Sequence, residues 1–438
     1  MTLQLYNFRL THMNNLVWFR NDLRSQDNNS LFKACANKGK TYGVYCVDPR
    51  QFEVTKHGFK KTEKFRAKFL LETLAELKSN LKNLNISLFV YYDTPENILP
   101  QVVSNLEISN IFLQKEWTPD EVEVEDAVRQ QCADVTWNEM YDQLLFHPND
   151  IPYTDFQKIP EVFTEFRKRC ERESKVRPCV EIVAQNADNL IGNTTNIPSL
   201  EDLGFENFEI HKNTAFPFKG GENQALKRIE NYFFETENLA KYKQTRNGLI
   251  GEAYSSKLSA WLANGSISVR TVYWEIKNFE SEIVANEDTY WLIFELIWRD
   301  YFKYVSLKHG EKIFKLDGIL GKSYEWKVNR KAFDSWVFGN TREPFVNANM
   351  RELLQTGFMS NRGRQNVASY WAKEWEQDWR IAAAYFESML IDYDVHSNYG
   401  NWCYNAGVGN DPRDRKFNIK RQAEMYDGSG KYQDLWNE

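Results

Sequence analysis

Alternating strand and helix patterns in the first third of the chain constrain its fold more than any other feature. Four short runs rich in β-branched and aromatic residues lie at residues 16–20, 42–47, 88–92 and 108–113. Between the second and third runs, residues 60–84 carry apolar side chains at three- and four-residue steps, which is typical of an amphipathic helix. Strands separated by helices predict an α/β domain with a parallel sheet and right-handed crossovers.

The predicted sheet lacks the glycine pattern of a dinucleotide-binding domain. The first predicted strand is followed by NDLR at residues 21–24, and residues 1–150 contain only Gly39, Gly43 and Gly58. A dinucleotide site needs glycine at the first strand-to-helix turn so that the backbone can approach the pyrophosphate. We therefore expect a Rossmann-like sheet without the Gly-rich fingerprint, and no standard NAD or FAD site within it.

The rest of the chain changes character twice. Residues 148–217 hold six of the twelve prolines and show no clear periodicity, which is typical of a segment that wraps a surface or links domains. From residue 216 onward the patterns are helical. We predict an α/β domain over residues 14–147, a connector over 148–215, and a larger all-α domain over 216–438.

Composition argues against several classes of protein. Mean hydropathy is -0.62 and no apolar run is long enough to cross a bilayer, so a membrane protein is not expected. No signal peptide is visible, which favours a cytoplasmic setting. The six cysteines form no CxxC pair and only six histidines occur, so we expect neither a metal site nor a disulfide framework. Because the net charge is -6, any DNA binding must use a local basic patch. Separately, we expect the protein to be a monomer.

One polar cluster in the helical half is a run of hydroxyls. Ser255, Ser256 and Ser259 surround Lys257 and Leu258 next to a predicted helix start. Such hydroxyls cap free backbone N–H groups, and the same geometry accepts a phosphate. On sequence alone the ordinary cap is the favoured interpretation.

Two further clusters carry charge. Arg362 and Arg364 lie beside Asn361, where they either clamp an anion or form a solvated turn before a helix. Asp392 and Asp394 follow an apolar helix and can converge from a loop on a guanidinium or a ring N–H. A metal pair there lacks ligand spacing, and nothing nearby indicates a nucleophile for acid–base catalysis.

Tryptophan is abundant, with 14 residues in a chain that is 15% aromatic. Trp371, Trp375 and Trp379 recur at four-residue steps, as a stripe on a helix would. Such a stripe is core packing by default, but indoles are also good electron-transfer relays. Spacing alone does not decide between the two.

Three longer stretches carry a family resemblance. YWLIFELIWRDY at 290–301, ANMRELLQTGFMSNRGRQNVA at 348–368 and DYDVHSNYGNWCYNAGVGND at 392–411 resemble the photolyase/cryptochrome family, most closely its cryptochrome-DASH branch. The resemblance runs from about residue 16 to residue 436 and implies a noncovalent FAD in the helical domain. The residues implied to bind it are Tyr242, Ser255, Ser256, Leu258, Ser259, Asn361, Arg364, Asp392, Asp394 and Asn398. Within this set Arg364 would pair with Asp392, and Asn398 would face flavin N5.

The resemblance also assigns roles to particular rings. Trp402, Trp379 and Trp326 match the family's photoreduction chain, with Trp402 nearest the flavin and Trp326 at the surface. Trp371 and Trp375 remain core candidates.

The substrate pocket is implied by four further residues. Glu295 and Trp298 match residues that hydrogen-bond to and stack on a flipped-out pyrimidine dimer. Gln365 and Tyr404 stand where conventional dimer photolyases place Met and Trp. The smaller apolar surface offsets less of the cost of base flipping, which favours single-stranded DNA. The implied mechanism is light-driven electron donation from reduced flavin to a cyclobutane dimer, ring splitting and electron return.

The N-terminal domain would hold a light-harvesting antenna. Glu116 matches a carboxylate that contacts the pterin of methenyltetrahydrofolate, and its neighbour Trp117 is unusual at that place. In the helical domain TREPFVN at 341–347 departs from the family pattern, with Arg342 replacing Gly and Asn347 replacing Asp. Arg342 would strain a turn that needs positive φ, whereas Asn347 retains the capacity to cap a helix.

These features favour an FAD-dependent photolyase-type lyase that repairs cyclobutane pyrimidine dimers, preferably in single-stranded DNA. One alternative is a blue-light photoreceptor that signals through tryptophan-mediated flavin photoreduction and binds nucleic acid with little repair. We expect no long C-terminal tail after Glu438 to carry a signal, which counts against the photoreceptor alternative. The other alternative is a non-photochemical flavoprotein that binds DNA or RNA.

Overall fold

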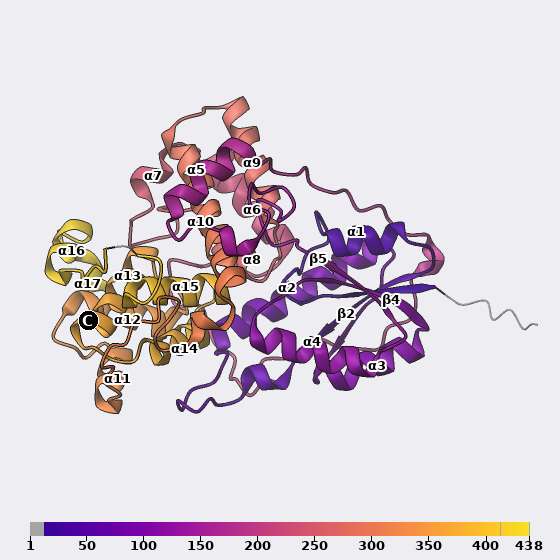
Figure 1. Cartoon of the computed structure of the whole chain (residues 1–438), viewed down its shortest axis with the longest axis horizontal. Helices are drawn as coiled ribbons and strands as arrows, with labels where there is room; N and C mark the ends of the chain where they lie inside the picture. The colour runs from indigo at the N-terminus through magenta and orange to yellow at the C-terminus, as the bar shows by residue number, and fades with distance from the viewer. Residues whose placement is uncertain (1–12, 412, 438) are drawn as a thin grey trace, which may run out of the picture.

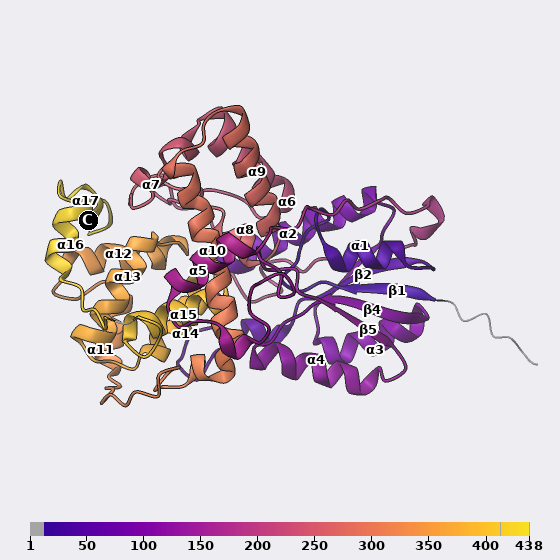
Figure 2. The same ribbon diagram turned by 45° about the horizontal axis from the view of Figure 1, so that its top comes forward.

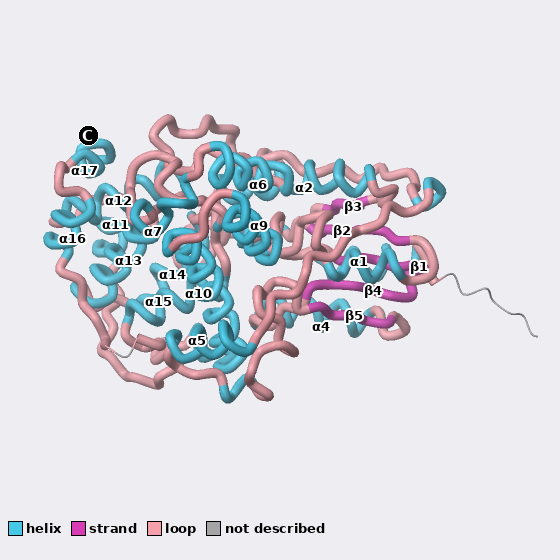
Figure 3. The backbone as a smooth tube through the Cα atoms, turned by 90° about the horizontal axis from the view of Figure 1, so that it is seen from above, coloured by secondary structure: helices cyan, strands magenta, loops and turns pink. Residues whose placement is uncertain are grey.

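The computed structural model describes residues 13–411 and 413–437, which form an α/β part and a helical part side by side (Figure 1). The α/β part contains a parallel sheet of order β3-β2-β1-β4-β5, as Figure 3 shows from above. Its strands are β1 (Asn14–Trp18), β2 (Thr41–Cys46), β3 (Leu88–Tyr91), β4 (Ile108–Gln114) and β5 (Thr136–Met140). Its helices are α1 (Asn29–Ala36), α2 (Lys64–Asn83), α3 (Pro95–Asn105) and α4 (Pro119–Gln131). The predicted fold class is confirmed, although β5 was missed.

Side chains of the central strands alternate between two apolar layers, as the pleat requires. Val17 and Phe112 pack with α1 and α2, whereas Leu16 and Leu113 pack with α3 and α4. Both faces of the sheet are therefore covered by helices (Figure 1). This double cover explains why consecutive residues of β1 (16–18) and β4 (111–113) are apolar instead of alternating with polar ones.

Strand order reverses at the centre of the sheet. From β1 the chain adds β2 and β3 on one side, then returns to place β4 and β5 on the other. In such sheets, ligands bind in the crevice outside the carboxyl ends of the strands at this switch point. The loops after β1 and β4 are thus a predicted ligand site, even without the glycine fingerprint.

The helical part surrounds one long helix, α10 (Glu287–His309), visible through the middle of this part in Figure 2. A capping box between Asn286 and Thr289 fixes its start, with the Thr289 amide donating to Asn286 at 2.9 Å. Among residues 13–411 and 413–437, no helix has the length and apolar content to cross a membrane. The other helices of this part are α6 (Glu222–Ile229), α7 (Tyr242–Thr245), α8 (Ser259–Ala263), α9 (Val269–Glu282), α11 (Arg330–Val337), α12 (Pro344–Thr356), α13 (Asn361–Ser369), α14 (Trp379–Met389), α15 (Val395–Ala406), α16 (Ile419–Tyr426) and α17 (Lys431–Asn437).

The tryptophan stripe does not lie on one continuous helix, so that expectation was wrong. After α13 the backbone forms a π-helix at Tyr370–Glu374, called η7, and α14 begins only at Trp379. Glu376 has a φ of 56°, and Asp378 then caps α14. This break places Trp371 and Trp379 in the interior and leaves Trp375 half-buried.

Residues 148–215 link the two parts and return to the sheet. They include α5 (Phe163–Glu173), which packs against α10. The following irregular segment runs beside β2 and β3: the Asn189 side chain bonds the amide and carbonyl of Thr41 at 2.8 and 2.9 Å. Farther along, the Thr195 hydroxyl accepts from the Val90 amide at 2.9 Å. These bonds satisfy backbone groups at the edge of the sheet and give the irregular segment a fixed course.

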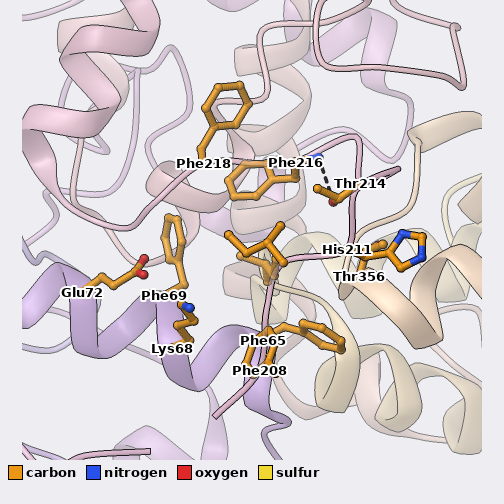
Figure 4. A pocket seen from close by; sticks show the side chains of 12 residues that line it. Phe65, Lys68, Phe69, Glu72, Phe208, His211, Thr214, Phe216, Phe218 and Thr356 are labelled. Atoms are coloured by element: carbon orange, nitrogen blue, oxygen red, sulfur yellow. Dashed lines mark hydrogen bonds between the residues drawn. The ribbon is translucent and has the colours of Figure 1, made fainter.

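At the end of this irregular segment, the phenyl rings of residues 208–218 pack against α2. Figure 4 shows Phe216 and Phe218 facing Phe69 of that helix, with Phe208 beside Phe65. The cavity between them is about 30 Å³, room for about one water molecule. It is therefore too small for a cofactor.

The two departures at 341–347 have simple structural consequences. Arg342 is not among the described residues with positive φ, so the expected strain is not found. Its guanidinium forms an exposed ion pair with Glu374 at 2.7 Å. Asn347 lies inside α12, where its Oδ1 accepts from the amide and hydroxyl of Thr341 at 2.8 and 2.7 Å. Asn347 thus closes the turn before α12.

Candidate functional site

The serine loop before α8 is held by one buried arginine. Arg228 of α6 donates to the carbonyl oxygens of Ser255 at 3.1 Å and Ser256 at 3.0 Å. The N-cap position of α8 is Leu258, and no side-chain cap bond forms there. The ordinary-cap interpretation of these serines is therefore wrong for α8. Ser256 and Leu258 are buried, while Ser259 is exposed.

Lys257, inside this loop, has a buried amino group without a hydrogen-bond partner among the described residues. Its φ is 62°, its side chain is 3% exposed, and its Nζ lies 3.1 Å from the Tyr254 ring centroid and 4.8 Å from that of Phe358. The Tyr254 hydroxyl likewise has no hydrogen-bond partner within residues 13–411 and 413–437. Burial lowers the pKa of Lys257 well below its ordinary value, against the pull of Glu352. Such orphaned polar groups are costly, so we infer that a polar ligand completes their bonding.

Glu352 of α12 is buried and interacts electrostatically with Lys257. Its Oε2 accepts from the Tyr432 hydroxyl at 2.6 Å, while its Oε1 has no partner within the part of the chain described. Burial raises its pKa to about 7, although Tyr432 and Lys257 favour the charged form. Lys257, Tyr254 and Glu352 together form a polar cluster short of partners.

This buried acid predicts a pH-dependent stability. With its pKa raised from 4.5 to about 7, Glu352 holds a proton in the folded chain that the unfolded chain releases. The free energy of unfolding should therefore fall as pH rises from about 4.5 to about 7, by on the order of 3 kcal/mol from this group. Urea unfolding across this range should show the slope flattened in Glu352→Gln. The exposed control Glu325→Gln should keep it; equal slopes in all three proteins would contradict the assignment.

The two arginines of the Asn361 cluster have separate partners. Arg364 Nη2 lies 2.9 Å from both carboxylate oxygens of Asp392, and its Nε donates to a backbone carbonyl at 2.9 Å. Arg362 instead donates to Gln365 at 2.8 Å. The expected Arg364–Asp392 pair is thus present, whereas a joint anion clamp by both arginines is not formed. Asn361 lies exposed at the start of α13.

Asp394 and Asn398 lie on the first turns of α15. Asp394 caps this helix by accepting from the Ser397 amide at 2.8 Å, and Lys303 of α10 donates to it at 2.8 Å. Burial alone would raise the pKa of Asp394, but Lys303 holds it well below its usual range. Asp394 is therefore a fixed negative charge. The Asn398 side chain, one turn later, donates to the Ala383 carbonyl at 3.0 Å.

Glu295 lies on α10 opposite α7. Arg246 forms an ion pair with it at 2.6 Å, and Tyr242 of α7 is buried nearby. Burial raises the pKa of Glu295, which Arg246 counteracts. Glu295 and Trp298, three residues apart on one helix, face the same side.

Trp298 has aromatic neighbours on two sides. Phe163 of α5 stacks on its face with ring centroids 3.6 Å apart and planes 11° apart. Tyr404 approaches edge-on at 6.3 Å, and its hydroxyl accepts from Arg415 at 3.0 Å. Trp298 is only half-buried, so its ring is braced by Phe163 and still accessible. No sequence pattern had marked Phe163, which comes from the connector.

A large cavity lies at the predicted switch point of the sheet. Its volume is about 950 Å³, and residues after β1, β2 and β4 line it together with residues of α10 and α15. Glu116 accepts from Gln143 at 3.2 Å, whose Oε1 accepts from Lys303 at 2.6 Å, and Lys303 reaches Asp394. A polar chain therefore joins Glu116 to the first turn of α15.

Trp117 is not among the residues that line this cavity. Its indole N–H donates to Ser306 at 2.7 Å, and its ring stacks on His396 with centroids 4.7 Å apart. The unusual indole thus joins the α/β part to α10 and α15. It leaves Glu116, which lines the cavity, free to face a ligand.

The three tryptophans of the expected relay have different ring neighbours. Trp402 contacts Trp336 at 6.4 Å and Phe386 at 5.1 Å. Trp379 contacts Tyr399, and Trp326 contacts Tyr324. Trp336 was not singled out by any sequence pattern.

Several site residues therefore escaped sequence reasoning. Arg246, Lys303, Phe163 and Trp336 reach their partners from distant elements, and no short-range spacing marks them. Within residues 13–411 and 413–437, no three His, Cys, Asp or Glu side chains gather in a way that could hold a metal ion.

Comparison with known proteins places these features in context. The family described as DNA photolyase matches residues 15–184, and the FAD binding domain of DNA photolyase matches residues 291–437. A cryptochrome DASH of Xenopus laevis is 46% identical over 95% of this chain and 81% of its own length. One from Gloeobacter violaceus is 45% identical over 96% of this chain and 85% of its own.

Solved structures of a cryptochrome and a photolyase superpose closely on this chain. A cryptochrome from Synechocystis sp. superposes with a TM-score of 0.91 at 42% identity, covering 97% of this chain and 89% of that one. A bacterial class III photolyase from Agrobacterium tumefaciens gives 0.81 at 26% identity, over 99% and 88% of the two chains.

Proposed function

This chain belongs to the photolyase/cryptochrome family, and from that premise we propose that it is a blue-light-driven flavoprotein that splits cyclobutane pyrimidine dimers, preferentially in single-stranded DNA. It carries the FAD-binding domain of DNA photolyases, which supports FAD as its cofactor. FAD, when bound, supplies light absorption and one-electron chemistry. The chain's own residues hold it, exclude water and present the lesion.

The orphaned groups around the serine loop fit such a cofactor. The Lys257 amino group, which has no partner among the described residues, would bind the diphosphate, together with backbone N–H groups of residues 255–259. Arg364, fixed by Asp392, would offer its guanidinium to the flavin ring system. Asp394 and Asn398 would also contact the flavin, and the Asn398 amide would be the group that faces its N5.

The observation that carries the repair proposal is the pairing of Glu295 with a braced, accessible indole at Trp298. Glu295 would accept from the N–H groups of a flipped-out dimer while Trp298 stacks on its bases. Gln365 and Tyr404 complete the pocket with polar atoms. These polar atoms offset less of the cost of extracting a dimer from a duplex, which favours single strands.

A repair assay tests this proposal. FAD-loaded protein with a reductant should remove dimers from single-stranded oligonucleotides under blue light, and remove them more slowly from duplexes. Dark samples and undamaged strands are the controls. Unchanged dimers in illuminated single strands, with a normal flavin spectrum, would overturn the repair proposal and favour the photoreceptor alternative.

We also propose that the 950 Å³ cavity holds a methenyltetrahydrofolate antenna. Glu116, held by Gln143 and nearly buried, would accept from the pterin ring. A charge-assisted bond of this kind contributes about 1.5–3 kcal/mol, so Glu116→Gln should weaken folate binding by at least about tenfold. The near-UV absorption band of added folate measures this. Glu123→Gln, at the exposed rim of the same cavity, should bind normally; equal losses in both variants would contradict the role of Glu116.

A further inference from the structure

Four indoles form an unbroken row that differs from the expected relay. Trp402 contacts Trp336 at 6.4 Å, Trp336 contacts Trp371 at 5.1 Å, and Trp371 contacts Trp375 at 6.5 Å between ring centroids. The row starts on α15, crosses α11 and ends just after η7. Its inner three rings are buried, and Trp375 is half-buried.

We propose that this row is a second electron-transfer branch to the flavin, parallel to Trp379 and Trp326. The inference rests on the proposed function, because its oxidant is light-excited oxidised flavin. One electron passes from Trp402 to that oxidant. Trp336 then refills Trp402, Trp371 refills Trp336, and Trp375 refills Trp371, so the electron hole moves outward along the row.

The inner indoles cannot trap the hole by losing a proton. The Trp336 N–H is buried with no hydrogen-bond partner among the residues described. The Trp371 N–H donates at 3.0 Å to the carbonyl of Asp378, which is not a base at neutral pH. Oxidation of either ring therefore leaves a radical cation that keeps its proton. Such a cation is readily reduced again by the next ring.

Trp375 is where the hole can be trapped. Its backbone amide donates to the Tyr370 carbonyl at 3.0 Å, which closes the last turn of the π-helix. Turns of this kind are frequent at functional positions. The ring is half-buried and lies 4.8 Å from the ring of Tyr370 between centroids, so it is the member of the row that water can reach. Its radical cation gives its N–H proton to water. A thiol then donates one hydrogen atom to the neutral radical, which restores the indole, and two thiyl radicals pair as a disulfide.

The two branches end on adjacent segments. The Lys327 amide donates to the Glu376 carbonyl at 2.8 Å, and the Asp378 amide donates to the Lys327 carbonyl at 2.9 Å. Trp326 and Trp375 therefore reach one surface. At Trp326, however, the indole nitrogen is itself buried without a partner in the described chain. Trp375 is thus the better position for the radical to lose its proton. One soluble reductant would reduce both the Trp326 and the Trp375 radicals.

Paired variants of the FAD-loaded protein separate the branches. Trp326→Phe alone should keep much of the long-lived tryptophan radical seen by transient absorption and electron paramagnetic resonance after a light flash. Adding Trp375→Phe should remove most of what remains. The matched control adds Trp274→Phe, an indole that is 40% exposed outside both rows, and should change nothing further.

Failure of the branch and failure of the flavin chemistry give different results. Equal radical yields in the Trp326→Phe protein and the Trp326→Phe/Trp375→Phe protein would overturn the branch. If Trp402→Phe leaves the radical undiminished, the proposed photoreduction route fails at its first step. A second measurement needs no substitution and so avoids any folding defect of a variant. The unmodified protein is illuminated in air, and oxidised residues are mapped by peptide mass spectrometry. Light should oxidise Trp375 more than Trp274, and equal oxidation would also overturn the branch.

Discussion

Replacing Arg364 with methionine should yield protein that no longer retains flavin. The Asp392 carboxylate, 8% exposed, would lose both of its 2.9 Å bonds to the guanidinium. Removing one partner of a buried ion pair costs about 3–5 kcal/mol, because the other charge stays buried and unpaired. Arg364 is itself partly exposed, so the lower end applies. Loss of the charge-assisted hydrogen bond that the guanidinium would make to the flavin costs about 1.5–3 kcal/mol of binding free energy, which corresponds to about ten- to 150-fold weaker cofactor binding.

The flavin-to-protein absorbance ratio of the purified variant measures this loss. Arg342→Met is the matched control, because Arg342 pairs with Glu374 at 2.7 Å in an exposed position. Exposed pairs contribute at most about 1 kcal/mol, so this variant should keep its flavin. Normal flavin content in Arg364→Met would remove Arg364 from the cofactor site. Equal losses in both variants would point to a general folding defect.

The strands that the sequence predicted are those whose surroundings are apolar on both faces. Residues of β1 and β4 pack against helices on each side, so residues 16–18 and 111–113 are consecutive apolar residues. β5 escaped because it is an edge strand with the sequence TWNEM and no fully buried residue. Its place is fixed by pairing with β4, a tertiary contact that leaves no local pattern.

The candidate site divides in the same way. Arg364 and Asp392 sit in stretches whose residues resemble a family motif, and their pairing could be predicted. Arg246 reaches Glu295 from another helix, and Phe163 reaches Trp298 from the connector. Neither partner has a sequence signal, because the fold alone sets those distances. The same holds for the break at residues 370–378, which no helical periodicity anticipates.

Replacing Trp298 with alanine should reduce binding of a pyrimidine dimer in single-stranded DNA by about five- to 150-fold. Stacking of a base on an aromatic side chain contributes about 1–3 kcal/mol, and this indole offers the accessible ring of the pocket. Phe163, stacked behind it at 3.6 Å, keeps the ring in place before the lesion arrives. Trp298→Phe retains an aromatic face and should recover part of the affinity.

Binding measured in the dark, with damaged and undamaged strands of one sequence, isolates this effect. Loss of stacking removes the preference for the dimer, whereas contacts to the phosphate backbone give affinity to both strands alike. Trp298→Ala should therefore bind undamaged DNA as the parent protein does. Trp274→Ala, which changes an indole outside the pocket, should keep the preference. If Trp298→Ala weakens both strands equally, or leaves the preference intact, Trp298 is not the wall on which the lesion stacks.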